Sequence, residues 1–275
     1  MTRCVLSLFM AAALVPAGLA QNFTNNTEKQ MKCESRENSG DDSRRKQACD
    51  VKEFRVSSVS KLVVDGRQNG GVDVKGWAGN DVLVRAKVQV WAPSGAGDPT
   101  GMIGQVSVQT ADGNVRADGP DFGRDSGFAV SYEIFVPHRT GLDLKAHNGG
   151  LSIRDVSGEI RFQTVNGGVN LMRLAGNVVG STQNGGVKVD LDGSRWDGTQ
   201  LDVKTTNGGI QMSIPANYSA RLESSTVNGG VNIDFPVTVS GRLKLNKEVA
   251  VTLGSGGALV RAVTTNGGVS IKKRA

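Results

Sequence analysis

The residues most suggestive of chemistry in this sequence are the asparagines of a repeated Asn-Gly-Gly motif. Glycine allows the backbone to approach a ligand closely, so one such turn could form a binding loop. The motif occurs seven times, however, and Thr stands two positions before the Asn in five copies. This repetition favours a structural role, as the corner of a repeating fold. The asparagines are Asn69, Asn148, Asn166, Asn184, Asn207, Asn228 and Asn266, and the threonines are Thr164, Thr182, Thr205, Thr226 and Thr264.

Few other residues are candidates for catalysis. The chain has two histidines, His138 and His147, and no Gly-x-Ser-x-Gly nucleophile elbow. A serine hydrolase triad is therefore not expected. Asp190 and Asp192 form the best local pair of carboxylates for a glycosidase, but they alternate with apolar residues and are interpreted as the solvent face of a strand. We expect no catalytic residues and a protein that is not an enzyme.

No pattern for a cofactor or a metal ion is present. The glycine-rich segment Gly254–Gly257 lacks the Lys-Ser/Thr pair of a phosphate-binding loop. Cys33 and Cys49 have no His or further Cys nearby that could complete a zinc site. An even pair of cysteines in an exported protein instead predicts a disulfide. We therefore expect no metal site and no cofactor.

One aromatic residue is a candidate for contact with a ligand. Trp196 lies in the polar stretch SRWDG, where an exposed indole ring could stack on a sugar. The alternative is that the ring packs over the end of a coil. Trp196 is thus the single ligand contact that the sequence suggests.

The motif recurs with the spacing of a structural repeat. Successive asparagines from Asn148 onward are separated by 18, 18, 23, 21 and 38 residues, and the last spacing predicts an insertion or a copy without its signature. Apolar residues follow each motif at alternate positions, as Val169 and Leu171 do, which is typical of a strand with one buried face. Between Asn69 and Asn148, the pair Asp112-Gly113 is interpreted as a degenerate copy. We therefore predict an all-β fold.

Two architectures fit a repeat of about 18–23 residues. In a β-meander, each Asn-Gly is a type I′ hairpin turn with φ > 0 at both positions. In a β-solenoid, each repeat is one coil, and equivalent side chains stack about 4.8 Å apart. Stacking rewards the same side chain in every coil, because Asn can both donate and accept along a ladder and stacked Thr pairs add contacts. The repeated residues favour a single β-solenoid, with Gly supplying φ > 0 at each corner.

Composition divides the chain into three segments. Residues 1–20 contain Arg3, a short apolar run and small residues before Gln21, which predicts a secretory signal peptide. Residues 21–53 are polar and predict a flexible leader whose fixed point is the disulfide loop. Residues 54–275 form the repetitive β domain. No later stretch is apolar for long enough to span a bilayer, so we expect an exported protein in the periplasm or outside the cell.

The T-x-N-G-G-V-x-V repeat, with its following Gly-containing step, resembles the bacterial toast-rack or adhesin-like domain family of unknown function over residues 55–275. The resemblance implies a solenoid-like fold in envelope-associated or exported proteins, and it brings no catalytic motif. We therefore expect a structural or adhesion-type protein that binds an unidentified envelope polymer, surface or protein through its solenoid faces. The alternatives are a polysaccharide-active enzyme on a β-helix scaffold and an envelope scaffold that self-assembles through its coil ends.

Charge supports two further expectations. The chain has 32 basic and 26 acidic residues without a dense basic stripe, so nucleic acid is not an expected partner. Lys272, Lys273 and Arg274 directly precede the last residue, Ala275, and charged residues protect a free sheet edge against pairing with other chains. We predict that this tail covers the end of the stack, and that its deletion promotes association.

Overall fold

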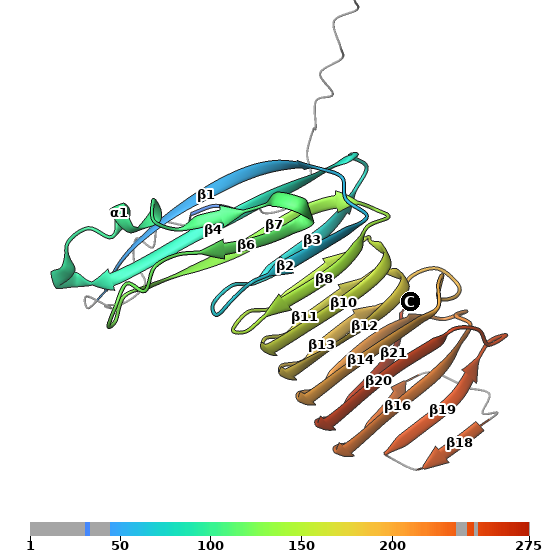
Figure 1. The fold of residues 1–275 in the computed structure, drawn as a ribbon. Coiled ribbons are helices and arrows are strands. Elements are labelled where there is room, and N and C mark those ends of the chain that lie inside the picture. Colours follow the sequence, from blue (N-terminus) through green and yellow to red (C-terminus); the bar gives the residue numbers. More distant parts are fainter. Residues whose placement is uncertain (1–30, 34–44, 235–240, 245–246, 275) are drawn as a thin grey trace, which may run out of the picture. The chain divides into compact units, whose positions relative to one another are not determined.

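A computed structural model describes residues 31–33, 45–234, 241–244 and 247–274, and its strands form two sheets (Figure 1). The predicted signal peptide and most of the predicted leader lie outside the described residues. Among those described, no helix has both the length and the apolar character needed to cross a membrane. The short helical segments are α1 (Thr100–Ile103) and two 3-10 turns, η1 (Ser94–Ala96) and η2 (Ala111–Gly113).

Sheet A has ten described strands in the order β1, β4, β7, β3, β9, β11, β13, β15, β21 and β17. In that order they span Arg45–Ser57, Asp81–Pro93, Gly127–Pro137, Val72–Trp77, Leu151–Arg154, Val169–Met172, Val187–Asp190, Ile210–Pro215, Val269–Arg274 and Val231–Asp234.

Sheet B has eleven described strands in the order β18, β19, β16, β20, β14, β12, β10, β8, β2, β6 and β5. In that order they span Gly241–Lys244, Glu248–Leu253, Ala220–Asn228, Leu259–Asn266, Gln200–Asn207, Ala175–Asn184, Ser157–Asn166, Gly141–Ala146, Lys61–Asp65, Asn114–Asp118 and Ser107–Gln109.

Each coil of the stack contains one strand of sheet B, an Asn-Gly-Gly corner and one strand of sheet A (Figure 1). The coils pair in parallel with the motif in phase, so that Asn166 is opposite Asn184 and Asn184 is opposite Asn207. Parallel pairing is incompatible with a meander of hairpins. The predicted all-β, solenoid-like fold is confirmed, and the meander alternative is wrong.

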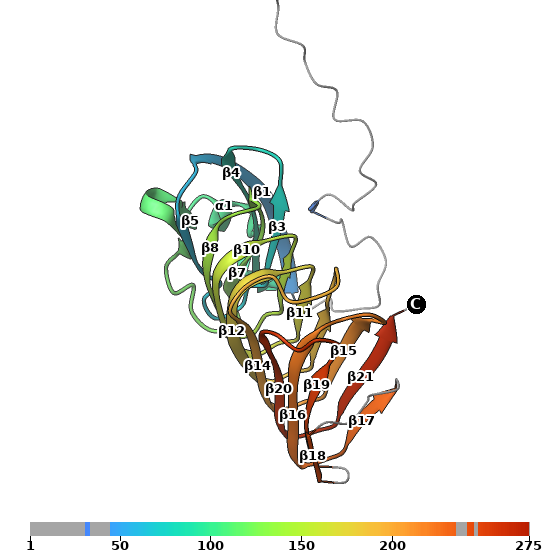
Figure 2. The ribbon, with the colours of Figure 1, turned by 90° about the vertical axis from the view of Figure 1, so that its right-hand side faces the viewer.

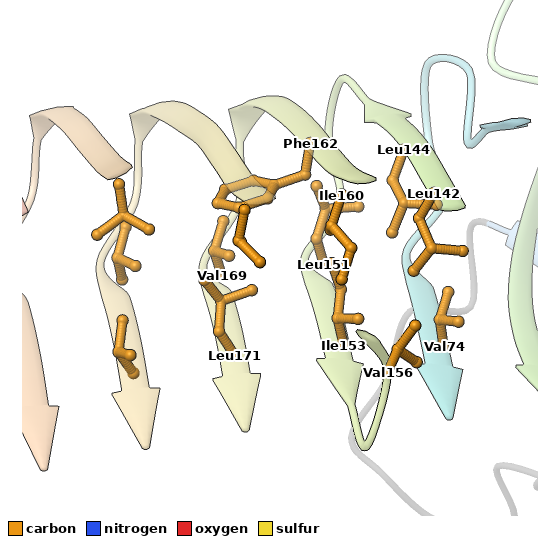
Figure 3. Close-up of a cluster of buried hydrophobic side chains, with 14 of the residues drawn as sticks. Val74, Leu142, Leu144, Leu151, Ile153, Val156, Ile160, Phe162, Val169 and Leu171 are labelled. Atoms are coloured by element: carbon orange, nitrogen blue, oxygen red, sulfur yellow. The ribbon is translucent and has the colours of Figure 1, made fainter. Parts of the chain in front are cut away.

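The core lies between the two sheets and follows from the alternation of apolar residues. Val169 and Leu171 of sheet A and Ile160 and Phe162 of sheet B are all buried (Figure 3). Their neighbours in sequence point outward, as the two-residue period of a strand requires. Where the Phe162 ring needs space, the next coil has Gly180, because a Cβ atom there would lie 2.4 Å from the ring.

The N-terminal part departs from the coil pattern. The strands β1, β4 and β7 pair antiparallel at the edge of sheet A, and β1 and β4 have 13 residues each. Strand β1 begins at Arg45, so residues 45–53 are part of the sheet and not of a flexible leader, which corrects the predicted boundary. The predicted disulfide between Cys33 and Cys49 is present, and it attaches residue 33 to β1.

The interpretation of Asp112-Gly113 as a copy of the motif is wrong. The pair lies in η2, which joins the antiparallel neighbours β5 and β6 within sheet B, whereas each Asn-Gly-Gly joins a strand of sheet B to a strand of sheet A. Both residues are left-handed, with φ of 53° and 71°. This tight turn lies at the N-terminal end of β6, whereas the Asn-Gly-Gly motifs lie at the C-terminal ends of sheet B strands.

The last coil in sequence is not the last coil in space. Strands β20 and β21 lie between the coil of β14 and β15 and the coil of β16 and β17 (Figure 2). The 38-residue spacing before Asn266 holds an insertion, because β18 and β19 extend sheet B as antiparallel strands beyond β16. Lys272, Lys273 and Arg274 are in β21, which has a partner on each side. They cannot cover the end of the stack, so the predicted capping role of this tail is wrong.

Candidate functional site

The seven motif asparagines form one ladder along the stack. The Asn166 side chain donates from Nδ2 to Asn148 Oδ1 at 2.8 Å and accepts from Asn184 Nδ2 at 2.8 Å. The ladder runs in spatial order through Asn69, Asn148, Asn166, Asn184, Asn207, Asn266 and Asn228. Its amides are exposed, but they hydrogen-bond to one another. The ladder therefore connects coils and is a poor candidate for a ligand loop.

The motif threonines are buried and bond to the backbone. Thr164 Oγ1 donates to Gly149 O of the preceding coil at 2.9 Å, and Thr164 is 2% exposed. Thr182, Thr205, Thr226 and Thr264 each make the corresponding bond at 2.8 Å, to Gly167, Gly185, Gly267 and Gly208. The stacking contact expected between threonines is thus accompanied by a specific bond to the corner carbonyl of the neighbouring coil.

Together these bonds satisfy the backbone at the corner. Using Asn166-Gly167-Gly168 as the example, Gly167 N–H donates to Asn184 O, and Leu151 N–H donates to Gly168 O. The carbonyl of Gly167 accepts from the Thr182 hydroxyl. Buried backbone groups need such partners. The Thr is therefore repeated because its hydroxyl provides a donor for the carbonyl of the first motif glycine in the neighbouring coil.

The glycines are required for close approach and not for the predicted left-handed turn. Among the glycines of the seven motifs, Gly267 alone has a φ between +20° and +160°, at 157°. A Cβ atom on Gly167 would lie 2.0 Å from Gly149 O, and the first glycines of the other coils meet the same obstacle. On the second glycine, Gly168, the nearest atom to a Cβ is 3.6 Å away. The prediction that Gly supplies φ > 0 at the corners is therefore wrong.

Trp196 is not available for contact with a ligand. The residue is 5% exposed, and its indole Nε1 donates to Gly176 O at 2.9 Å. The ring packs in the core, in line with the alternative interpretation, because a buried indole that finds an acceptor for its N–H is stable there. The suggested sugar contact at Trp196 is corrected accordingly.

The carboxylate pair is held by an arginine. Arg274 donates to Asp190 Oδ1 at 3.0 Å and to Asp192 Oδ1 at 2.6 Å. The hydrogen bond from Arg274 lowers the pKa of Asp192 below its ordinary value, so Asp192 is ionised at neutral pH and cannot be a general acid there. His138 and His147 are exposed and distant in sequence from this pair. The part of the chain that the structure describes contains no cluster of three potential metal ligands.

The outer side of sheet A has an open groove of about 710 Å³ beside the corners. Its lining includes the exposed second glycines of five coils, whose missing side chains leave the groove open. One polar residue of each coil also lines it, and these residues are paired in register: Asn170, Lys188, Gln211, Ser270 and Asn232. The lining has one cation and no carboxylate. At about 4.8 Å per coil, this row is roughly 19 Å long.

This polar row can donate and accept hydrogen bonds at regular intervals, but it lacks groups for acid–base or nucleophilic chemistry. Sequence reasoning did not single it out, because its residue types differ from coil to coil. The row could have been found from its fixed position in the repeat. Each of its residues is the second residue after an Asn-Gly-Gly motif, as Asn170 is, directly after the apolar Val169.

The sequence matches the family model of the Toastrack domain (DUF4097) over residues 66–272. The chain belongs to the Toastrack family. Among curated proteins, none matches this Toastrack chain.

Several solved structures align with the Toastrack chain at low identity. A candidate cell adhesion protein from Clostridium sporogenes has 13% identity and a TM-score of 0.39, covering 83% of this chain and 100% of its own. A candidate adhesin from Bacteroides fragilis has 12% identity and a TM-score of 0.38, covering 82% and 97%. A candidate adhesin from Parabacteroides merdae has 12% identity and a TM-score of 0.37, covering 81% and 95%.

Proposed function

We propose that this Toastrack protein is an exported, adhesin-like binding protein that holds an extended polymer of the bacterial envelope along the sheet A groove without catalysing a reaction. The observation that carries the proposal is the row of one polar side chain per coil, in register over five coils. A linear polymer with repeated hydrogen-bonding groups could contact several members of the row at once. Weak contacts made by one connected ligand add to a useful affinity.

The corner structure supports this role by making the groove rigid. The Asn ladder, the Thr bonds and the close-packed first glycines fix the coils relative to one another. A rigid surface loses little conformational entropy when a ligand binds. The repeated Asn-Gly-Gly corners would then have the role of keeping the neighbouring sheet A groove rigid.

A non-enzymatic role is favoured by the chemistry of the groove and of the aspartates. The groove lining has no carboxylate, histidine or cysteine, and the best acid pair is bound by Arg274. Glycoside hydrolysis needs one protonated and one ionised carboxyl group. The polysaccharide-active enzyme therefore remains the less supported alternative.

Export is part of the proposal. The signal-like residues 1–20 support it, and so does the Cys33–Cys49 disulfide, because disulfides persist in oxidising compartments. The periplasm and the cell exterior both fit.

The test is co-sedimentation of the secreted protein with insoluble envelope polymers, beginning with peptidoglycan sacculi and chitin. A Lys188→Ala/Gln211→Ala variant should bind at least about tenfold more weakly, which corresponds to the loss of two modest hydrogen bonds. The matched control is Lys204→Ala/Arg161→Ala, which removes two exposed side chains from sheet B. Equal binding by both variants would contradict the groove as the binding surface, and release of soluble sugar from the polymer would support the enzyme instead.

A further inference from the structure

A second hollow, of about 780 Å³, lies where the ends of β2, β8 and β10 meet β6, β7 and the loop between them. It shares no lining residue with the sheet A groove. Its volume is in the range of sites that bind small molecules. We propose that this hollow binds a neutral carbohydrate, as a free oligosaccharide or as the end of a glycan chain.

Part of the lining of the hollow is aromatic. Phe122 and Phe128 pack edge to face with their ring centroids 6.1 Å apart, and Trp91 contributes a third ring. All three side chains are half-buried, so each has surface that a ligand can cover. Trp91 lies close against Gly127, where a Cβ atom would be 2.7 Å from the indole ring. The apolar C–H face of a sugar ring can stack on such aromatic surfaces.

The rest of the lining is polar and carries both signs of charge. Asp65 and Asp121 balance Arg67 and Lys145 in the lining, so the hollow has no net charge that would select an ionic ligand. Asp65 accepts a bond from the backbone N–H of Arg67, and the Arg67 guanidinium donates to Asp118 at 2.6 Å. These bonds hold the polar side in place. Sugar hydroxyls, which both donate and accept, match a surface that contains both kinds of group.

The decisive group is the hydroxyl of Tyr132. Tyr132 lines the hollow and is 1% exposed, and its hydroxyl has no hydrogen-bond partner within the described residues. A buried hydroxyl without a partner is costly, and a bound molecule that accepts its hydrogen bond would remove this cost. Burial, followed by the charges of Asp65 and Asp118, raises the pKa of the phenol. Tyr132 therefore stays a neutral O–H that can donate to a sugar oxygen.

A purely apolar ligand fits less well. A fatty chain would stack on Phe122 and Phe128, but it would leave Tyr132 without a partner and would cover charged groups that it cannot hydrogen-bond. A neutral sugar satisfies the aromatic side, the mixed polar side and the Tyr132 hydroxyl together.

The test uses the secreted protein and four neutral disaccharides as probes: cellobiose, N,N′-diacetylchitobiose, maltose and xylobiose. Binding is measured by calorimetry and by saturation-transfer NMR. We expect at least one probe to bind, and Tyr132→Phe and Phe122→Ala each to weaken that binding by about tenfold. We also expect Tyr132→Phe to unfold at the same temperature as the parent or higher, because it removes a hydroxyl that has no partner in the ligand-free protein.

Tyr218→Phe is the matched control. Tyr218 is the other tyrosine of the chain, is 4% exposed and does not line the hollow, so its variant should bind the same probe with unchanged affinity. The proposal is overturned if none of the four probes binds, or if Tyr132→Phe and Tyr218→Phe bind equally well. It is also overturned if monomeric dodecylphosphocholine binds in the hollow and displaces the sugar, since the site would then be one for amphipathic chains.

Discussion

The parallel coils formed by β8 to β17, β20 and β21 and the antiparallel strands β1, β4 and β7 share one core but are stabilised differently. In the coils, neighbouring backbones approach so closely at each corner that a Cβ atom on Gly167 would lie 2.0 Å from a carbonyl oxygen. In the antiparallel part, the close neighbour of Gly127 is the Trp91 side chain, at 2.7 Å. The coils therefore depend on backbone geometry that cannot adjust, whereas the antiparallel strands depend on side-chain packing that can.

The same difference separates the polar bonds of the two regions. In the coils, identical residues repeat one bond, such as that from Thr164 to Gly149, along the stack. In the antiparallel part, the polar contacts are individual, such as the pair of Arg85 in β4 and Glu133 in β7 at 3.1 Å. The loss of stability caused by a substitution in one coil should thus predict the loss caused by the same substitution in another coil. It should not predict the loss caused by a substitution in the antiparallel strands.

The largest effect is expected from Gly167→Ala. The methyl group collides with backbone, so we expect a loss of about 3 kcal/mol or more in the free energy of unfolding. Gly127→Ala meets a side chain that can move and should cost about 1 kcal/mol. Gly168→Ala, whose Cβ atom has 3.6 Å of space, should be nearly neutral. Urea denaturation of the three variants checks the order, and equal losses at Gly167 and Gly127 would break the comparison between the two regions.

The next largest effect is expected from Thr164→Val, which should lower the free energy of unfolding by about 2 kcal/mol. The change preserves shape but leaves Gly149 O without the Thr164 hydroxyl, and an unpaired buried acceptor is costly. Thr164→Ser keeps the hydroxyl and is the control. Thermal denaturation measures both. If the Ser variant lost as much stability as the Val variant, packing of the methyl group would matter more than the bond.

Asn166→Ala should cost about 1 kcal/mol, because its two ladder bonds are exposed and water can replace them. At the end of the ladder, Asn69 has one such bond, to Asn148, and Asn69→Ala should cost about half as much. Asn166→Ala should lower the unfolding temperature, but it should not weaken the binding of a polymer to the groove. A specific loss of binding by Asn166→Ala at unchanged stability would make the corner a site.

The smallest effect is expected from Arg274→Ala, and it depends on pH. The Arg274 hydrogen bond holds the pKa of Asp192 below its ordinary value, so this bond stabilises the fold at neutral pH, and its contribution is lost as the pH falls through the lowered folded-state pKa. The pair is exposed, so its contribution should be below about 1 kcal/mol. The difference in unfolding temperature between parent and variant should shrink from pH 7 to pH 3. A constant difference would assign the effect to packing of the Arg274 stem.

The repeats made the solenoid predictable from sequence. Equivalent Asn and Thr residues in every coil indicated stacking, and the alternation of Val169 and Leu171 indicated which face is buried. The reason for the glycines was not predictable, because a left-handed turn and a close backbone approach select the same residue. The structure distinguishes them, since Gly167 has an obstructed Cβ position without a left-handed φ.

The antiparallel part and the two hollowed surfaces could not be predicted in this way. Strands β4 and β7 alternate like any half-buried strands and have no repeated residue that would fix their partners. Tyr132, Phe122 and Lys145 line one hollow but come from three separate segments. The spatial order of the last coils was also hidden, because Asn228 pairs with Asn266, which comes later in the sequence, and the motifs themselves do not specify the order in which they stack.

The position of the last coil has a consequence for how the chain matures. Both sheet B partners of β16, namely β19 and β20, come after it in the sequence. The coil of β16 and β17 therefore has no earlier segment to dock on, and it must wait until residue 266 has been delivered before the Asn207–Asn266–Asn228 part of the ladder can form. A chain that crosses a membrane from its N-terminus can assemble its first coils during transit. In the export proposed above, the coil of β16 and β17 could close only after residue 266 has crossed the membrane.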